Sequence, residues 1–140
     1  MRLYLATTLL LCTACLSSGC GHRGPPVIDV RGTVTYRGQP LNLGTVRFTP
    51  ASRPGEGSAR PATSVIAHDG SYRLRAFPDR DGAQPGEYLV SVSSYTGSHL
   101  DGNVKHLIPE KFSATATSAM KATVPSESND PVRIDFNLTD

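Results

Sequence analysis

Side chains that could do chemistry gather in two places, the first twenty residues and the segment 95–106. All three cysteines lie at positions 12, 15 and 20, and the later segment holds Tyr95, His99, Asp101 and His106. Two histidines and a carboxylate can ligate a metal ion and support hydrolysis, and an exposed tyrosine can stack on a sugar ring. The spacing of the two histidines is irregular, which favours an exposed polar loop. We therefore treat these four residues only as candidate ligand contacts.

Other patterns with a chemical meaning are incomplete. The segment 79–82, Asp-Arg-Asp-Gly, begins like a calcium loop but lacks the further ligands and the bidentate glutamate at position twelve. The chain has no serine in a Gly-x-Ser-x-Gly setting and no glycine-rich phosphate loop. The prediction is therefore a protein without enzymatic activity, cofactor or metal site.

Composition narrows the possible partners. The chain of 140 residues has a formal net charge of +2 and three scattered lysines, at positions 105, 111 and 121. A balanced charge of this kind predicts no nucleic-acid partner. After position 20 the chain has no cysteine, so its folded part has no disulfide and no thiol nucleophile.

The first nineteen residues have the pattern of an export signal. Met1 and Arg2 give a positive start, and residues 3–16 are apolar apart from three threonines. An apolar run of about fourteen residues is shorter than the roughly twenty needed to span a bilayer. Small residues follow at 17–19, as they do before the cut of a secretory signal peptide. Residues 1–19 are therefore predicted to be a signal peptide.

The sequence Ser-Ser-Gly-Cys at 17–20 resembles the bacterial lipoprotein signal. The resemblance implies that Cys20 becomes the mature N-terminus, thioether-linked to diacylglycerol and N-acylated, so that the partner is a membrane. The family prefers Leu where this chain has Ser17, and the alternative is an ordinary secretory signal that leaves Cys20 as a free thiol or removes it. Gly21 stands where an aspartate would resemble an inner-membrane retention signal, so the implied location is the outer membrane.

The domain boundaries follow from this signal. Residues 20–26 comprise the modified cysteine and a short Gly/Pro linker, and residues 27–140 form a single domain. Six linker residues reach at most about 20 Å, which keeps the domain close to the lipid surface.

Alternation of apolar and polar residues predicts an all-β domain. Apolar positions recur with period two in several short runs separated by Gly- and Pro-rich turns, and no helical period exceeds two turns. Between them, the segment 96–118 lacks the alternation, although residues 114–120 could hold one helical turn. The expected fold is a single antiparallel β-sandwich of approximately seven strands, with the segment 30–50 as a strand–turn–strand at its first edge. The predicted strands are 27–36, 45–49, 64–68, 71–75, 87–93, 121–124 and 132–139.

Three phrases, at 32–41, 69–74 and 85–92, resemble the transthyretin-like, carboxypeptidase-regulatory-like domain of small bacterial lipoproteins. The resemblance implies a transthyretin- or immunoglobulin-like sandwich and gives little information on biochemical role. Some transthyretin-like proteins hydrolyse a purine breakdown product and end in Tyr-Arg-Gly-Ser. This chain ends in Asn-Leu-Thr-Asp, so that activity is not expected.

The function predicted from the sequence is that of a non-enzymatic, membrane-anchored lipoprotein of the cell envelope with a structural or interaction role. Its expected partners are the membrane, through the lipid anchor, and an envelope protein or polysaccharide. The alternative is a carbohydrate-binding module at the cell surface, with Tyr95 and the following loop as its contact.

Overall fold

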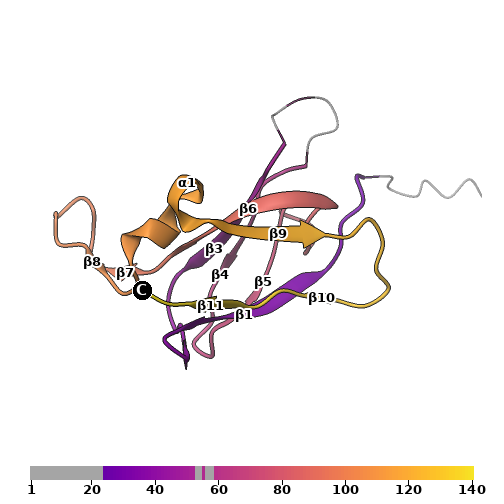
Figure 1. Ribbon diagram of the computed structural model, residues 1–140. Coiled ribbons are helices and arrows are strands. Elements are labelled where there is room, and N and C mark those ends of the chain that lie inside the picture. Colours follow the sequence, from indigo (N-terminus) through magenta and orange to yellow (C-terminus); the bar gives the residue numbers. More distant parts are fainter. Residues whose placement is uncertain (1–23, 53–54, 56–58) are drawn as a thin grey trace, which may run out of the picture.

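The computed structural model describes residues 24–52, 55 and 59–140. The predicted signal peptide, Cys20 and the first linker residues lie outside the described residues. Strands make up most of the regular structure, which confirms the all-β prediction (Figure 1). In chain order the strands and short helices are β1 (Val30–Tyr36), β2 (Gln39–Pro40), β3 (Thr45–Pro50), β4 (Ala62–Val65), β5 (Ser71–Arg73), β6 (Gly86–Ser93), β7 (Tyr95–Thr96), β8 (Lys105–His106), η1 (Glu110–Ser113), α1 (Thr115–Ser118), β9 (Met120–Val124), β10 (Val132–Arg133) and β11 (Phe136–Leu138).

Strand β1 is the centre of the first sheet. It pairs antiparallel with β5 and β2, and parallel with β10 and β11. The prediction that this strand forms an edge is therefore wrong, and the first sheet is not purely antiparallel. The segment 30–50 is also not one hairpin, because β1 turns into β2 while β3 belongs to a different sheet. Because β1 has neighbouring strands on both sides, its backbone N–H and C=O groups find hydrogen-bond partners within the sheet.

The second sheet is antiparallel, in the order β4-β3-β6-β9. Its inner face is lined by alternate residues such as Val46, Phe48, Tyr88, Val90 and Val92, all at most 1% exposed. This is the inward set that the alternation predicted. The strand predicted at 64–68 begins and ends earlier, at Ala62 and Val65, with Ala62 fully buried.

The β4–β5 connection links the two sheets. Thr63 and Arg75 exchange backbone hydrogen bonds of 3.1 and 2.9 Å. The turn between the strands contains Gly70, which has a φ of +81° and accepts a hydrogen bond from Val34 of β1. Glycine adopts a positive φ without a steric penalty, and Asp-Gly is a common turn sequence between two strands.

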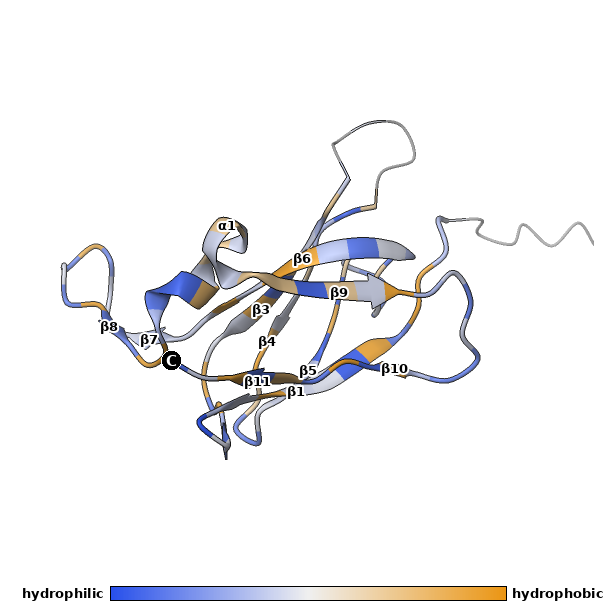
Figure 2. Cartoon of the chain, viewed as in Figure 1, coloured by the Kyte–Doolittle hydropathy of each residue, from blue (hydrophilic) through white to orange (hydrophobic). Residues whose placement is uncertain are grey.

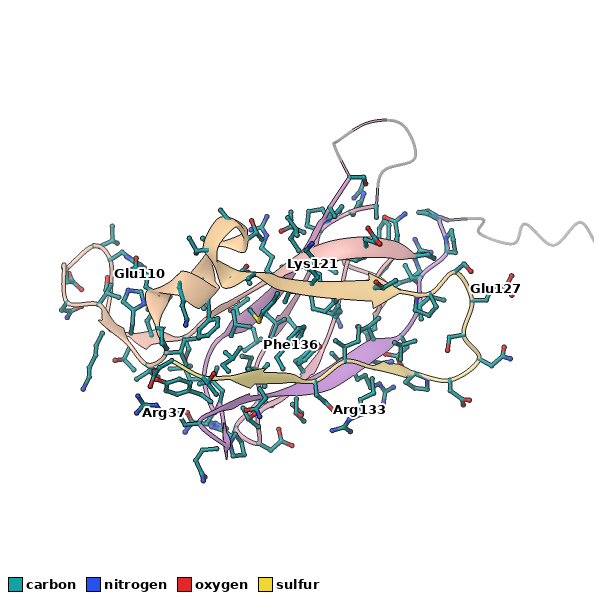
Figure 3. All side chains as sticks on the ribbon, in the orientation of Figure 1. Arg37, Glu110, Lys121, Glu127, Arg133 and Phe136 are labelled. Carbon is teal, nitrogen blue, oxygen red and sulfur yellow. The ribbon has the colours of Figure 1, made fainter. Side chains whose placement is uncertain are left out.

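One apolar core fills the space between the two sheets. Orange and blue positions alternate along their strands in Figure 2. Phe48 of β3 lies 6.4 Å from Tyr72 of β5 and 6.0 Å from Phe136 of β11, measured between ring centroids. In Figure 3, Phe136 lies between β9 and the β10–β11 segment. Side chains from both sheets therefore share one core.

The last strand predicted, 132–139, is interrupted. Between β10 and β11 the carbonyl of Ile134 turns toward Gly32, where an added Cβ would lie only 1.7 Å from its oxygen. The hydroxyl of Tyr72 donates a 2.6 Å hydrogen bond to the same carbonyl. Gly32 therefore permits a close approach of two backbone segments inside one sheet.

The segment 96–118 folds back on β6. Ile108 and Phe112 are 4% and 7% exposed, and the Ser118 hydroxyl donates to the Val90 carbonyl at 2.5 Å. The helical turn expected within 114–120 is α1. Burial of two large side chains and a hydrogen bond from a side-chain hydroxyl to the backbone hold this irregular segment in place.

Candidate functional site

Three arginines stand directly opposite one another across neighbouring strands. Arg31 of β1 is in register with Arg73 of β5 on one side and with Arg133 of β10 on the other. All three are exposed, and Figure 3 shows Arg133 pointing away from the space between the sheets. Like charges directly opposite destabilise a sheet, so this row requires counter-charges.

Asp29 supplies the first counter-charge. Its carboxylate accepts from Arg31 Nη2 at 2.6 Å and from Arg73 Nη2 at 2.9 Å, so one aspartate joins two facing arginines. The hydrogen bond from Arg31, followed in size by the one from Arg73, lowers the pKa of Asp29 from its ordinary value of 3.8 to about 2. Asp29 is therefore ionised at every physiological pH.

Asp81 and Asp135 complete the network. Asp81 accepts from Arg73 Nη1 and Arg75 Nη2, both at 2.8 Å. Asp135 accepts from Arg133 Nε at 2.8 Å, and its pKa is lowered mainly by that hydrogen bond. Arginines and aspartates alternate along the outer face, which leaves guanidinium groups half exposed but held in defined positions.

A shallow hollow of about 650 Å³ lies beside this network. Val65, which is 74% exposed, adds an apolar surface to it. Planar guanidinium groups beside an open hollow suit carboxylate or phosphate oxygens, which they can bind with two parallel hydrogen bonds. The residues at the hollow include Thr63, Val65, Arg73, Arg75, Phe77 and Asp81.

Two more arginines stack on Phe77 at the end of the hollow. The guanidinium carbons of Arg60 and Arg80 lie 5.2 and 4.6 Å from the Phe77 ring centroid, which is cation–π distance. Arg80 Nη1 also donates a 3.1 Å hydrogen bond to the carbonyl of Pro25. The start of the described chain therefore lies against this stack. We call the set Arg31, Arg60, Arg73, Arg75 and Arg80 the arginine face.

The structure brings together three of the four candidate contacts predicted from the sequence. Tyr95 of β7 is 39% exposed, and its ring centroid lies 5.0 Å from that of His99 and 6.2 Å from that of His106. Asp101 is exposed in the connecting loop. Among the described residues, no group of three or more His, Cys, Asp or Glu side chains is placed to hold a metal ion. The cluster is an aromatic surface.

This aromatic cluster is far from the arginine face. Figure 1 shows the β7–β8 hairpin at one end of the molecule and the first described residues at the other. Leu100 in the hairpin loop is 98% exposed. The domain thus has two chemically different ends.

A second, smaller hollow lies along β11 near the C-terminus. It has a volume of about 280 Å³ and includes Met120 of β9, Phe136 and Lys111 in its lining. The C-terminal Asp140 also lines it and is ion-paired with Arg37.

Sequence reasoning missed the arginine face. Arg31 on β1 and Arg73 on β5 each had the outward parity of its strand, which is the ordinary position of a solvated charge. Their cross-strand register depends on pairing between segments far apart in the sequence. The one local signal was the pair of arginines, Arg73 and Arg75, that flank inward Leu74.

No helix among the residues that the structure describes has the length and apolar character to cross a bilayer. Comparison of the chain with protein-family models, with curated proteins and with solved structures found no match.

Proposed function

We propose that this chain is a membrane-anchored lipoprotein of the cell envelope, whose domain has an interaction role and no catalytic one. The observation that carries the proposal is the position of Cys20 in the sequence Ser-Ser-Gly-Cys, directly before the folded domain. The first core residue is Ile28, and the described core extends to Leu138. A lipid on Cys20 would therefore hold the whole domain close to the bilayer.

The domain itself is proposed to be a β-sandwich of the transthyretin-like, carboxypeptidase-regulatory-like kind. Two sheets that contribute to one core support this proposal, as do the turns at Gly70 and Gly86, which both have positive φ. In this interpretation the short strands β2, β7, β8 and β10 are additions to a framework of about seven strands.

Ion pairing of the carboxylates supports an interaction role. A general base works best with a pKa near the operating pH, so a carboxylate whose pKa is far below that pH is a poor general base. The pKa of Asp29 is about 2, and that of Asp135 is also lowered, in each case chiefly by hydrogen bonds from arginine. The buried hydroxyls of Tyr72 and Tyr88 donate to the backbone carbonyls of Ile134 and Gln84. These groups hold the fold together.

Gly21 follows the proposed acylation site, so we place the protein in the outer membrane of a two-membrane bacterium. Several acyl chains would anchor it stably, since each buried methylene contributes about 0.8 kcal/mol.

Metabolic labelling with a fatty-acid analogue tests the anchor. The wild-type chain should carry the label, Cys20→Ser should lose it, and Cys15→Ser should keep it, because position 15 lies inside the predicted signal peptide. Label that persists in Cys20→Ser, or a wild-type chain without label, would contradict the proposal.

A second candidate function is carbohydrate binding at the cell surface. The exposed Tyr95 ring, flanked by the His99 and His106 rings, favours it, because sugar rings stack on exposed aromatic faces. A glycan array with a soluble chain of residues 21–140 provides the test. Binding that is lost in Tyr95→Ala and kept in Leu100→Ala supports this function, and binding unchanged in Tyr95→Ala removes the site.

A further inference from the structure

The arginine face lies where the chain enters the domain. Arg80 holds the carbonyl of Pro25, and a Cβ at Gly24 would lie 2.7 Å from an Arg80 guanidinium nitrogen. Only three residues, 21–23, lie between Cys20 and Gly24, so the two Cα atoms are at most about 14 Å apart. If Cys20 is acylated, as proposed above, the Arg60–Phe77–Arg80 stack is held near the lipid headgroups.

The charge of this face is positive. Its five arginines are opposed by three nearby aspartates, at positions 29, 79 and 81, which leaves an excess of two positive charges. Glu127 and Asp130 lie in the connection between β9 and β10. β10, which follows this connection, pairs with β1 at Arg31↔Arg133, whereas β5, which carries Arg73 of the arginine face, pairs with β1 at Arg31↔Arg73.

The hollow adds an apolar component to the same surface. Val65 is exposed on it, and Phe77 is partly exposed between two guanidinium groups. Arginine stems and aromatic rings are well suited to the boundary between headgroups and water, because their apolar parts and charged ends contact different layers.

We propose that the arginine face is a membrane-docking surface, on which the anchored domain lies against anionic lipid headgroups. Guanidinium groups bind the phosphate oxygens, with Val65 and Phe77 at the interface. The domain then lies on its β4–β5 side, and the aromatic cluster at Tyr95 points away from the anchor. This inference rests on the proposed acylation of Cys20.

The test uses the mature acylated chain in vesicles of neutral phosphatidylcholine, or of phosphatidylcholine with about one third anionic phosphatidylglycerol. The folded domain has no cysteine, so Val65→Cys introduces one thiol on the arginine face and Leu100→Cys one at the opposite end. The measurement is the rate at which a water-soluble maleimide labels each thiol.

Val65→Cys should react about tenfold more slowly on the anionic vesicles than on the neutral ones. Salt at about 0.5 M should remove the difference, because it shortens the Debye length to a few ångströms. Leu100→Cys should react equally on both. When Arg60→Gln and Arg75→Gln are combined with Val65→Cys, the slower labelling on anionic vesicles should disappear. When Lys105→Gln and Lys121→Gln are combined with it instead, the same charge is removed elsewhere and the slower labelling should remain.

Equal labelling of Val65→Cys on both vesicles, or protection that survives Arg60→Gln and Arg75→Gln, would overturn the docking surface. Protection that appears on neutral vesicles only after an acidic polysaccharide is added would also overturn it, in favour of a glycan ligand. Flotation separates this inference from the proposed function. A chain that floats with neither vesicle refutes the anchor, whereas one that floats with both and shows equal labelling refutes only the docking.

Discussion

Asp29 joins two arginines that would otherwise repel each other across the first sheet. Its carboxylate is bonded to Arg31 and Arg73, which are in register on β1 and β5. Both arginines are about half exposed, so solvent and salt screen the attraction, and we expect the pairs to contribute only about 1 kcal/mol. Their larger effect is to hold the guanidinium groups in fixed positions.

The first prediction concerns Asp29→Asn. The pKa of Asp29 is depressed from 3.8 to about 2, so its contribution to stability is complete above about pH 4 and is lost as the pH falls toward 2. Urea unfolding near pH 7 should show a loss of about 1 kcal/mol in the variant, and near pH 2 no difference from wild type. Asp101→Asn is the control and should be neutral at both. A difference that is equal at the two pH values would rule out this role.

The second prediction concerns Gly32. An alanine Cβ there would lie 1.7 Å from the Ile134 oxygen and 2.9 Å from the Tyr72 ring. Gly32→Ala must push β10 and β11 away from β1, and we expect a loss of about 3 kcal/mol in the free energy of unfolding. Gly55→Ala is the matched control, since nothing lies within 4 Å of its added Cβ. Thermal or urea unfolding that ranks the two variants equally would contradict the close contact.

At the scale of elements, η1 and α1 cover one end of β6 without belonging to a sheet. Phe112 and Ile108 attach this cover through buried side chains, and Ser118 attaches it through the Val90 carbonyl. The hairpin β7–β8 just before it has only two residues in each strand and an exposed loop. Irregular structure is thus held by a few contacts, which makes it sensitive to single substitutions.

The third prediction is that Phe112→Ala releases this cover. Loss of a buried phenylalanine should cost about 3 kcal/mol, and hydrogen exchange should quicken in η1, α1 and the adjoining end of β6 more than in β1. Leu100→Ala, another apolar residue of the same irregular region but 98% exposed, should leave both measurements unchanged. Uniformly faster exchange over the whole domain would show that the cover does not open separately.

For the whole molecule, one core makes the two sheets interdependent. Phe48 on the second sheet contacts Tyr72 and Phe136 on the first, so separating the sheets would expose all three rings. The chain after Cys20 has no cysteine, so no disulfide joins the sheets, and the shared core is the main contact between them.

The fourth prediction is therefore a single cooperative unfolding transition for residues 21–140. The calorimetric and van't Hoff enthalpies should agree, and a reducing agent should not shift the midpoint. Two resolved transitions would indicate that each sheet is stable alone, against the shared core.

The sequence by itself determined that the domain is all-β and which faces of its main strands are buried, but not the short strands β2, β7 and β8. Alternation is a local property, so it correctly predicted the buried faces on which Phe48, Tyr72 and Tyr88 lie. The predicted role of Cys20 likewise came from a local pattern and stays a prediction.

Tertiary structure decided which strands are neighbours. The central place of β1, its parallel pairing with β10 and β11, and the break at Ile134 all depend on backbone hydrogen bonds between distant segments. The arginine face has the same origin, because its members Arg31 and Arg73 meet only when β1 and β5 align in one register. Alternation reports which face of a strand is buried, and it carries no information on which strand lies beside it.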